Sequence, residues 1–421
     1  MNRIFVLLLF LGSCVASGAE NWPQFRGPRG DGESASKNLP LKWSESENIT
    51  WKTAIHGRAW GSPVIWENQV WLTTATPDGK ELSGLCVDKK TGKILFDEKL
   101  FDVADPQFAH KFNSYASPTP VIEEGRVYLT FGSPGTACID TETLKTLWTR
   151  RDLECDHFRG AGSSPVLFKN LLIMNFDGAD HQYVVALNKQ TGETIWKTER
   201  SIEWDDILPD GKAERDGDMR KAFATPHLIW QDKKPILISM GAKATYGYNA
   251  RDGKEVFRIE EMTSHSGSSR PVVDKDRFYI TTGFSRGQLW ALPRTISGVI
   301  KADDAVWTEK RGVPKKPSMI LVAGNLYMVD DGGIGTCRDA KTGEEIWKER
   351  IGGNFSASPI YADGRIYFCN EVGKIVVIKA SREFEVLAEN ELDEGFMASP
   401  AVSNGSLFLR SKTHLYRIDD K

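Results

Sequence analysis

The sequence predicts an all-β fold, a single eight-bladed β-propeller built from four-stranded antiparallel blades. Three observations lead to this prediction: a unit that returns eight times, a fixed spacing inside the second half of that unit, and chain ends that complement each other. Units of this length are too short to bury an apolar face alone, so each must stack on its neighbours. The repeat therefore indicates the architecture before any single residue is considered.

Each unit opens with a Ser/Thr-Pro step, followed by two short apolar runs that a polar turn separates. In the first unit, Pro63-Val64-Ile65 leads through Glu67-Asn68 to Val70-Trp71-Leu72. Two β-rich runs joined by a tight turn of Gly, Asn or Asp predict an antiparallel hairpin, which we assign to strands A and B of one blade. The units start at Pro63, Pro120, Pro165, Pro226, Pro271, Met319 (where the proline is lost), Pro359 and Pro400.

The second half of the unit places an Asp or Asn eight residues before an aromatic residue. A Gly between them, present in most units, supplies a positive φ, and the Asp or Asn side chain can bond nearby backbone amides. We interpret this half as the hairpin of strands C and D, and the aromatic residue as an apolar wedge between blades rather than a ligand-stacking residue. The spacing recurs from Asp88 to Phe96, Asp140 to Trp148, Asn188 to Trp196, Asn249 to Phe257 and Asp339 to Trp347.

The two ends of the chain predict how the ring closes. The eighth unit stops at Lys421 without a fourth strand, whereas a β-like segment at residues 48–55 precedes the first unit. If residues 48–55 complete the last blade, the ring has no open sheet edge. A linear solenoid, the alternative, would leave both ends unpaired. The predicted organisation is a signal peptide at 1–19, an N-terminal extension at 20–47 and the propeller at 48–421.

The N-terminus is typical of an exported protein. Arg3 precedes an apolar run from Ile4 to Leu11 that is too short to span a bilayer, and small residues follow it. Cleavage after Ala19 fits this pattern, but Leu11-Gly12-Ser13-Cys14 also resembles a lipobox, in which Cys14 would carry a lipid anchor. We expect a periplasmic or extracellular protein without a transmembrane span, and either form of processing is open.

The composition argues against several partners and sites. A formal net charge of -3 over 421 residues gives no global field that favours nucleic acid or an anionic membrane. The six cysteines include no Cys-x-x-Cys pair, so we predict neither a metal site nor a disulfide framework. Cys86, Cys138 and Cys337 occupy matching positions in their units, which indicates a demand for a small buried side chain. We expect a monomer.

The repeat also carries a resemblance to a known family. The eight-fold unit with its Asp-x-x-Thr-Gly-x-x-x-Trp half, as in Asp339 to Trp347, resembles the PQQ-like β-propeller repeat family over essentially the whole mature chain. The sequence Asn-Trp-Pro-Gln-Phe-Arg-Gly at 21–27 is similar to the start of many such exported propellers. The family includes quinoprotein alcohol and glucose dehydrogenases and the outer-membrane assembly lipoprotein BamB, so the resemblance implies the fold and leaves the activity open.

The resemblance implies what a quinoprotein dehydrogenase would need here. Such enzymes are longer, and they commonly carry a vicinal Cys-Cys disulfide, Glu, Asn and Asp ligands for calcium, and a catalytic Asp. This chain lacks the vicinal pair. We therefore assign no catalytic residue and predict no cofactor, with PQQ and calcium as the alternative. The predicted function is an exported, non-catalytic scaffold similar to BamB, whose partner is an envelope protein or a small anionic ligand.

The loops that lead into strand A, called the strand A loops below, should converge on one face around the central channel. They carry many cations and four of the seven histidines, which favours an anionic ligand or an acidic protein segment. Ordinary solvated loops would explain the same charges, and histidines that meet carboxylates would instead bind a metal. The candidate ligand-binding residues are His56, Arg58, Trp60, His110, Lys111, His157, Arg159, Lys221, His265 and Arg270.

Two further features bear on this face. The acidic insertion from Glu199 to Asp218 lacks periodicity and is best interpreted as solvated filler, with a cover over the strand A loops or a docking arm as alternatives. A carbohydrate-binding module is the remaining function class. It would use exposed aromatic residues at Trp60, Phe112, Tyr115, Phe355 and Phe396.

Overall fold

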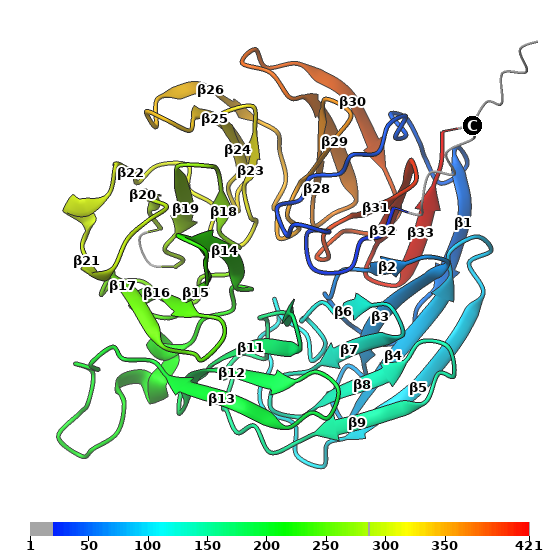
Figure 1. Cartoon of the computed structure of the whole chain (residues 1–421). Helices are drawn as coiled ribbons and strands as arrows, with labels where there is room; N and C mark the ends of the chain where they lie inside the picture. The colour runs from blue at the N-terminus through cyan, green and yellow to red at the C-terminus, as the bar shows by residue number, and fades with distance from the viewer. Residues whose placement is uncertain (1–19, 285–286, 421) are drawn as a thin grey trace, which may run out of the picture.

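The computed structural model describes residues 20–284 and 287–420, and it forms a closed ring of eight β-sheets (Figure 1). The predicted eight-bladed propeller is therefore confirmed. The predicted signal peptide at 1–19, including Cys14, lies outside the described residues. Among the described residues, no helix is long and apolar enough to cross a membrane.

Blades 1 to 4 are antiparallel meanders, and in each the innermost strand follows the Ser/Thr-Pro step. A fifth strand, β21 (Gly298–Ile300), adds in parallel to the outer edge of blade 4. The strands are, in blade 1, β2 (Val64–Trp66), β3 (Gln69–Ala75), β4 (Glu81–Asp88) and β5 (Ile94–Asp102); in blade 2, β6 (Val121–Glu123), β7 (Arg126–Thr130), β8 (Thr136–Asp140) and β9 (Thr146–Arg150); in blade 3, β10 (Val166–Phe168), β11 (Leu171–Asp177), β12 (Gln182–Asn188) and β13 (Thr194–Glu199); and in blade 4, β14 (His227–Gln231), β15 (Lys234–Met240), β16 (Ala244–Asn249) and β17 (Glu255–Glu260).

Blades 5 to 8 repeat this arrangement, and the first strand of the chain completes blade 8. Two short 3-10 segments, η1 (Glu214–Arg220) and η2 (Ala302–Asp304), lie in connections. The strands are, in blade 5, β18 (Val272–Val273), β19 (Arg277–Thr281), β20 (Leu289–Pro293) and β22 (Trp307–Glu309); in blade 6, β23 (Ile320–Val322), β24 (Asn325–Val329), β25 (Ile334–Asp339) and β26 (Glu345–Arg350); in blade 7, β27 (Ile360–Ala362), β28 (Arg365–Cys369), β29 (Lys374–Lys379) and β30 (Val386–Glu391); and in blade 8, β31 (Ala401–Ser403), β32 (Ser406–Arg410), β33 (His414–Ile418) and β1 (Ile49–Ala54).

The repeated aromatic residues wedge between blades, as the spacing predicts. Trp148 on the outer strand of blade 2 donates its indole N–H to the Lys189 carbonyl of blade 3, at 3.1 Å. Its ring lies opposite a small residue of strand C, and the same is true in every unit with this spacing. A Cβ on Gly247 would lie 2.1 Å from the Phe257 ring, so only a small residue fits there. The pairs are Cys86 with Phe96, Cys138 with Trp148, Ala186 with Trp196, Gly247 with Phe257 and Cys337 with Trp347.

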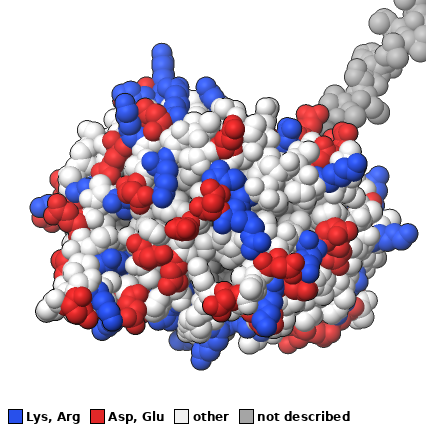
Figure 2. Space-filling view, turned by 90° about the horizontal axis from the view of Figure 1, so that it is seen from below, with Lys and Arg blue, Asp and Glu red and all other residues white. Residues whose placement is uncertain are grey.

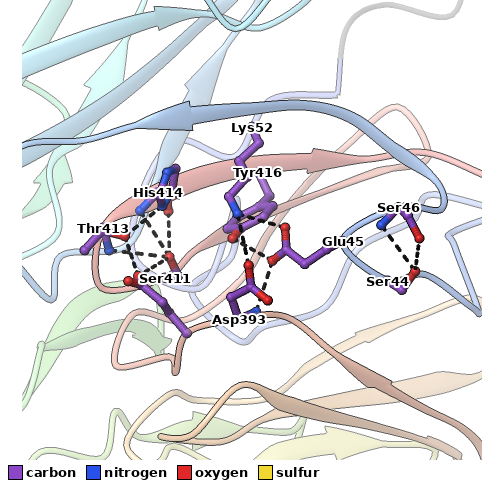
Figure 3. Close-up of polar contacts among 10 residues, drawn as sticks. Ser44, Glu45, Ser46, Lys52, Asp393, Ser411, Thr413, His414 and Tyr416 are labelled. Carbon is purple, nitrogen blue, oxygen red and sulfur yellow. Dashed lines mark hydrogen bonds and ion pairs between the residues drawn. The ribbon is translucent and has the colours of Figure 1, made fainter.

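The ring closes by pairing the two ends of the chain. Strand β1 pairs antiparallel with β33, which confirms the predicted closure and contradicts the linear solenoid. Polar contacts reinforce this seam (Figure 3). Lys52 on β1 lies 2.8 Å from the Glu45 carboxylate, and the Tyr416 hydroxyl donates to the same carboxylate at 3.0 Å.

A ring of side-chain hydroxyls also joins neighbouring blades around the channel. The Ser or Thr of each Ser/Thr-Pro step accepts a hydrogen bond from the backbone N–H of the matching residue in the preceding blade. Arg270 takes this position in blade 5 and has no hydroxyl, so the ring has seven bonds instead of eight. They run from the N–H of Ser62 to Thr119 (2.9 Å), Thr119 to Ser164 (2.9 Å), Ser164 to Thr225 (3.0 Å), Arg270 to Ser318 (2.9 Å), Ser318 to Ser358 (2.9 Å), Ser358 to Ser399 (2.8 Å) and Ser399 to Ser62 (3.0 Å).

The start of the described chain, residues 21–34, forms a plug that reaches into the ring, where it is drawn dark blue in Figure 1. Its backbone pairs with innermost strands of three blades, through Trp22 with Ile65 in blade 1, Pro23 with blade 2 and Gly32 with blade 7. Trp22 is fully buried in the core that joins blades 1, 7 and 8. The plug therefore closes the channel from the side of the turns between strands A and B.

Two buried arginines hold the plug in place. The Arg270 guanidinium of blade 5 donates to the Phe25 carbonyl and to the Gln24 side chain. Arg26 of the plug donates to the Met319 carbonyl of blade 6. Burial and the neighbouring Arg26 lower the pKa of Arg270 to about 9. The two blades that depart from the Ser/Thr-Pro step, at Arg270 and Met319, are thus the two blades that contact the plug through arginine side chains.

Candidate functional site

The channel is a blind pocket of about 460 Å³ that opens on the face of the strand A loops. Phe25 of the plug lies at its floor, and six hydroxyl groups of the inter-blade ring surround that floor. Four further aromatic rings line the walls, each from a different loop. These are Trp60, Phe112, Phe223 and Phe284. The pocket is therefore apolar in its walls and rich in hydroxyls at its base.

One wall of the pocket contains a carboxylate shared by two cations. Arg159 binds Asp218 through two hydrogen bonds of 2.9 Å, and Lys221 donates to the same carboxylate. Burial disfavours the charged form of Asp218, but the hydrogen bonds from Arg159 and Lys221 outweigh it and lower its pKa to about 2. Because two cations share one anion, this wall keeps an excess of positive charge.

The opposite wall contains a second set of charged residues. Lys316 lies 2.9 Å from the Glu371 carboxylate, which also accepts a hydrogen bond from Ser356 at 2.6 Å. Asp331 accepts the backbone N–H of Lys316 at 3.0 Å, and burial raises the pKa of its carboxyl. With one ammonium and two carboxyl groups, this wall carries no excess of positive charge.

The pocket histidines do not add charge near neutral pH. Burial and the nearby Lys221 lower the pKa of His265 to about 4. Burial, Arg159 and Lys111 lower the pKa of His110 as well. The positive charge of the pocket therefore resides in its Lys and Arg side chains.

The structure brings together part of the predicted ligand-binding set. Five of the ten residues line the pocket: Trp60, His110, Arg159, Lys221 and His265. Arg58 and Lys111 lie at its rim, where the Arg58 guanidinium is 5.1 Å from the Trp60 ring centre and the Lys111 ammonium is 5.4 Å from that of Phe112.

The other three predicted residues lie elsewhere. His56 pairs with Asp97 at 2.9 Å on the outside of blade 1. His157 is buried, and its Nε2 accepts the Ser133 N–H at 3.0 Å. Arg270 lies beneath the pocket and contacts the plug. Spacing within the repeat placed all three near the channel mouth, but it does not reveal how deep each side chain lies.

The acidic insertion is anchored to the propeller, contrary to its interpretation as solvated filler. Arg220 makes two buried hydrogen bonds to Asp206, at 2.6 and 3.1 Å, and Lys243 pairs with Asp205. Asp218, its last residue, forms part of the pocket wall. Its tip is a turn that projects outward at the lower left of Figure 1, where the side chain of Ile207 is 54% exposed.

Comparison with known proteins assigns the chain to a family. A family model described as outer membrane protein assembly factor BamB matches residues 43–201 and 180–421. The chain belongs to this family. Two curated BamB proteins align with it, one from Alkalilimnicola ehrlichii at 25% identity over 52% of this chain, and one from Vibrio cholerae at 22% identity over 66% of this chain. The alignments span 51% and 78% of those proteins, so the chain covers only about half of the first.

Solved structures with this fold include enzymes as well as the BamB type. A europium-containing methanol dehydrogenase matches with a TM-score of 0.71 at 11% identity, over 94% of this chain and 90% of its own. BamB from Moraxella catarrhalis matches with a TM-score of 0.61 at 12% identity, over 88% of this chain and 99% of its own. At these identities the likeness concerns the fold alone.

The described residues of this BamB-type propeller form no cluster of His, Cys, Asp and Glu side chains that would hold the metal of a dehydrogenase. In the pocket, Asp218 is engaged by two cations and Asp331 by backbone N–H groups. The described cysteines are all unpaired and buried.

Sequence reasoning missed several pocket residues of this BamB-type propeller. Phe25 was unpredictable because it arrives from the extension, and Asp218 because it ends an insertion without periodicity. Two of the aromatic residues expected for a carbohydrate site are buried, Phe355 at 0% exposure and Phe396 at 1%, so that expectation was wrong for them. The signal for the ring hydroxyls was present in the sequence, since they are the Ser and Thr of the repeated step.

Proposed function

We propose that this chain is an exported, non-catalytic propeller that acts as a protein-interaction scaffold in the cell envelope. Membership of the BamB-type family supports a role in assembly. The observation that carries the proposal is an exposed aromatic loop beside the pocket, at residues 108–112. Exposed apolar side chains on a loop held by a rigid scaffold are typical of a docking surface.

The aromatic loop is held in a defined shape. Phe108 is 63% exposed and Phe112 57% exposed. The His110 ring lies between them, 6.4 Å from Phe108 in an edge-on arrangement and 5.3 Å from Phe112. The Asn113 side chain fixes the base of the loop through three backbone carbonyls of residues 159–161. Because these contacts already order the loop in the free protein, a partner that binds its apolar side chains loses little conformational entropy.

The side of the disc drawn in Figure 2 carries no patch of a single charge sign among the described residues. Figure 2 shows one side of the disc, where basic and acidic side chains are interspersed. This pattern is typical of a solvated wall rather than of a docking site. The exposed Phe108 and Phe112 lead us to assign partner binding to the face of the strand A loops.

Site-specific photo-crosslinking in the native host tests this assignment. A benzoylphenylalanine at Phe108 should give a discrete adduct with one envelope protein. The same probe at Trp230, which is 48% exposed near the turn between strands A and B of blade 4, is the matched control and should give none. Equal adducts at both positions, or none at Phe108, would contradict the proposal. Stoichiometric binding of PQQ with calcium, accompanied by dye-linked alcohol or aldose oxidation, would replace it with the dehydrogenase.

A further inference from the structure

We infer that the blind pocket receives an acidic segment of a partner protein that carries an aromatic anchor residue. This inference rests on the proposed scaffold function and adds the chemistry of the partner. Three independent features of the pocket converge on it: the way the plug ends the channel, the donors that the hydroxyl ring leaves unused, and an imbalance of charge at the rim.

The plug determines what shape of ligand fits. Because Phe25 and the plug backbone close the channel, a polypeptide cannot thread through it, and only a projecting side chain can enter. The pocket of about 460 Å³ lies within the size range of ligand sites, about 300–1,000 Å³. Its five aromatic rings favour a flat apolar side chain. Aromatic anchors seated in such pockets commonly supply most of the binding energy of an interface.

The hydroxyl ring presents hydrogen-bond donors to whatever enters. Each of its seven hydroxyl oxygens accepts one backbone N–H, and none of them donates a hydrogen bond within the described part of the chain. Six of these groups line the pocket: Ser62, Thr119, Ser164, Thr225, Ser358 and Ser399. A hydroxyl with its acceptor capacity in use prefers an acceptor-rich ligand, such as a carboxylate or a peptide carbonyl.

The rim carries cations that lack a carboxylate partner. Within residues 20–284 and 287–420, Arg58, Lys111 and Lys315 form no ion pair, although each lies over an aromatic ring of the pocket. Arg159 and Lys221 share the single carboxylate of Asp218. This excess of positive charge surrounds the aromatic walls, so the complementary segment has Asp or Glu on both sides of its anchor.

Fluorescence anisotropy with three synthetic peptides tests the inference on the purified mature chain. The first peptide is Gly-Glu-Asp-Trp-Asp-Glu-Gly, the second has Ala for Trp, and the third has Lys for every acidic residue. We expect saturable binding of the first peptide that weakens as salt increases, about tenfold weaker binding of the second, and no binding of the third. Equal binding of the first and second peptides would assign the site to a bare anion and overturn the inference. Equal binding of the first and third would overturn it as well.

Charge-reversal variants locate the binding on the molecule. The double variant Lys111→Glu, Lys315→Glu should bind the first peptide about tenfold more weakly, because both charges are removed from the rim. Lys275→Glu is the matched control, since Lys275 is highly exposed in the turn between strands A and B of blade 5, on the opposite face, and should leave binding unchanged. An unaltered affinity in the double variant would overturn the inference.

The two proposals fail separately. If crosslinking at Phe108 captures an envelope protein but the acidic aromatic peptide does not bind, the scaffold remains and the inferred chemistry of its partner is wrong. If the peptide binds as expected but crosslinking gives no adduct, the pocket chemistry remains and the envelope scaffold is wrong.

Discussion

Arg270 of blade 5 has two roles, because its side chain holds the plug and its position belongs to the inter-blade ring of hydrogen bonds. The substitution Arg270→Ser separates these roles. It removes the guanidinium that donates to Phe25 and Gln24 of the plug. It also introduces a hydroxyl at the one position of the inter-blade ring that lacks it, next to the N–H of Thr225. The plug should therefore loosen while the ring itself is preserved or slightly strengthened.

The expected magnitude follows from the bonds that are exchanged. Hydrogen bonds from a charged donor contribute about 1.5–3 kcal/mol each, so the plug loses two such bonds. The cost of burying the Arg270 charge, which also lowers its pKa to about 9, offsets part of this loss. We expect a net decrease of about 3 kcal/mol in the free energy of local opening, which corresponds to about 100-fold faster amide exchange.

Hydrogen–deuterium exchange by mass spectrometry measures the effect. Peptides that cover residues 20–34, where Trp22 pairs with Ile65, should exchange about 100-fold faster, while peptides from blade 3 should be unchanged. Arg338→Ser is a matched control, because Arg338 is also buried but contacts Glu309, Gly343 and Glu345 instead of the plug. Unchanged exchange in residues 20–34, or equal acceleration in all blades, would refute the assignment of Arg270 as a latch.

Three further predictions concern stability, measured as the free energy of unfolding in urea. Trp22→Ala should lower it by about 3–5 kcal/mol, because the indole is fully buried between blades and leaves a cavity. Ser399→Ala should lower it by about 1–3 kcal/mol, because the buried Ser358 N–H loses its acceptor. Ser381→Ala, in the turn between β29 and β30, should have a smaller effect, because its hydroxyl bonds only the nearby Glu383 carbonyl and no N–H of another blade depends on it. Burial lowers the pKa of His157 to about 4 from 6.5, so the unfolded chain takes up its proton first and stability falls by about 3 kcal/mol as pH drops from 6.5 to 4. His157→Gln should remove that portion of the pH dependence, and an unaltered profile would contradict the buried neutral form.

The fold was predictable because most blades repeat the same pattern of turn and aromatic residues. The Gly, Asp and aromatic residues of the C–D hairpin act through contacts within one unit or with the next, so their spacing is visible along the sequence. Even the small residues at Cys86 and Gly247 follow from the aromatic ring packed over them. Closure of the ring followed from counting strands, and the pairing of β1 with β33 confirms it.

The site was only partly predictable, because its decisive contacts join residues far apart in the sequence. Topology brought cations to one face, as expected, but the charge of that face depends on Asp218, which an insertion without periodicity delivers. It also depends on burial, which keeps His265 neutral. The plug was not foreseen, because the contacts of Arg26 with Met319 and of Arg270 with Phe25 join residues hundreds of positions apart.

The two departures from the Ser/Thr-Pro step, at Arg270 and Met319, both lie where the plug contacts the ring, and one explanation accounts for both. A ring of eight inter-blade bonds tolerates the loss of one, because seven bonds and the pairing of the chain ends still hold all blades in sequence. Blade 5 therefore has a position where Arg270 can turn inward without opening the ring. That arginine and its neighbour Arg26 carry buried charge at a cost in stability, and burial lowers the pKa of both. A merely structural plug could be held by apolar packing alone. The retention of two buried charges argues that the position of Phe25, the floor of the pocket, is what these residues specify.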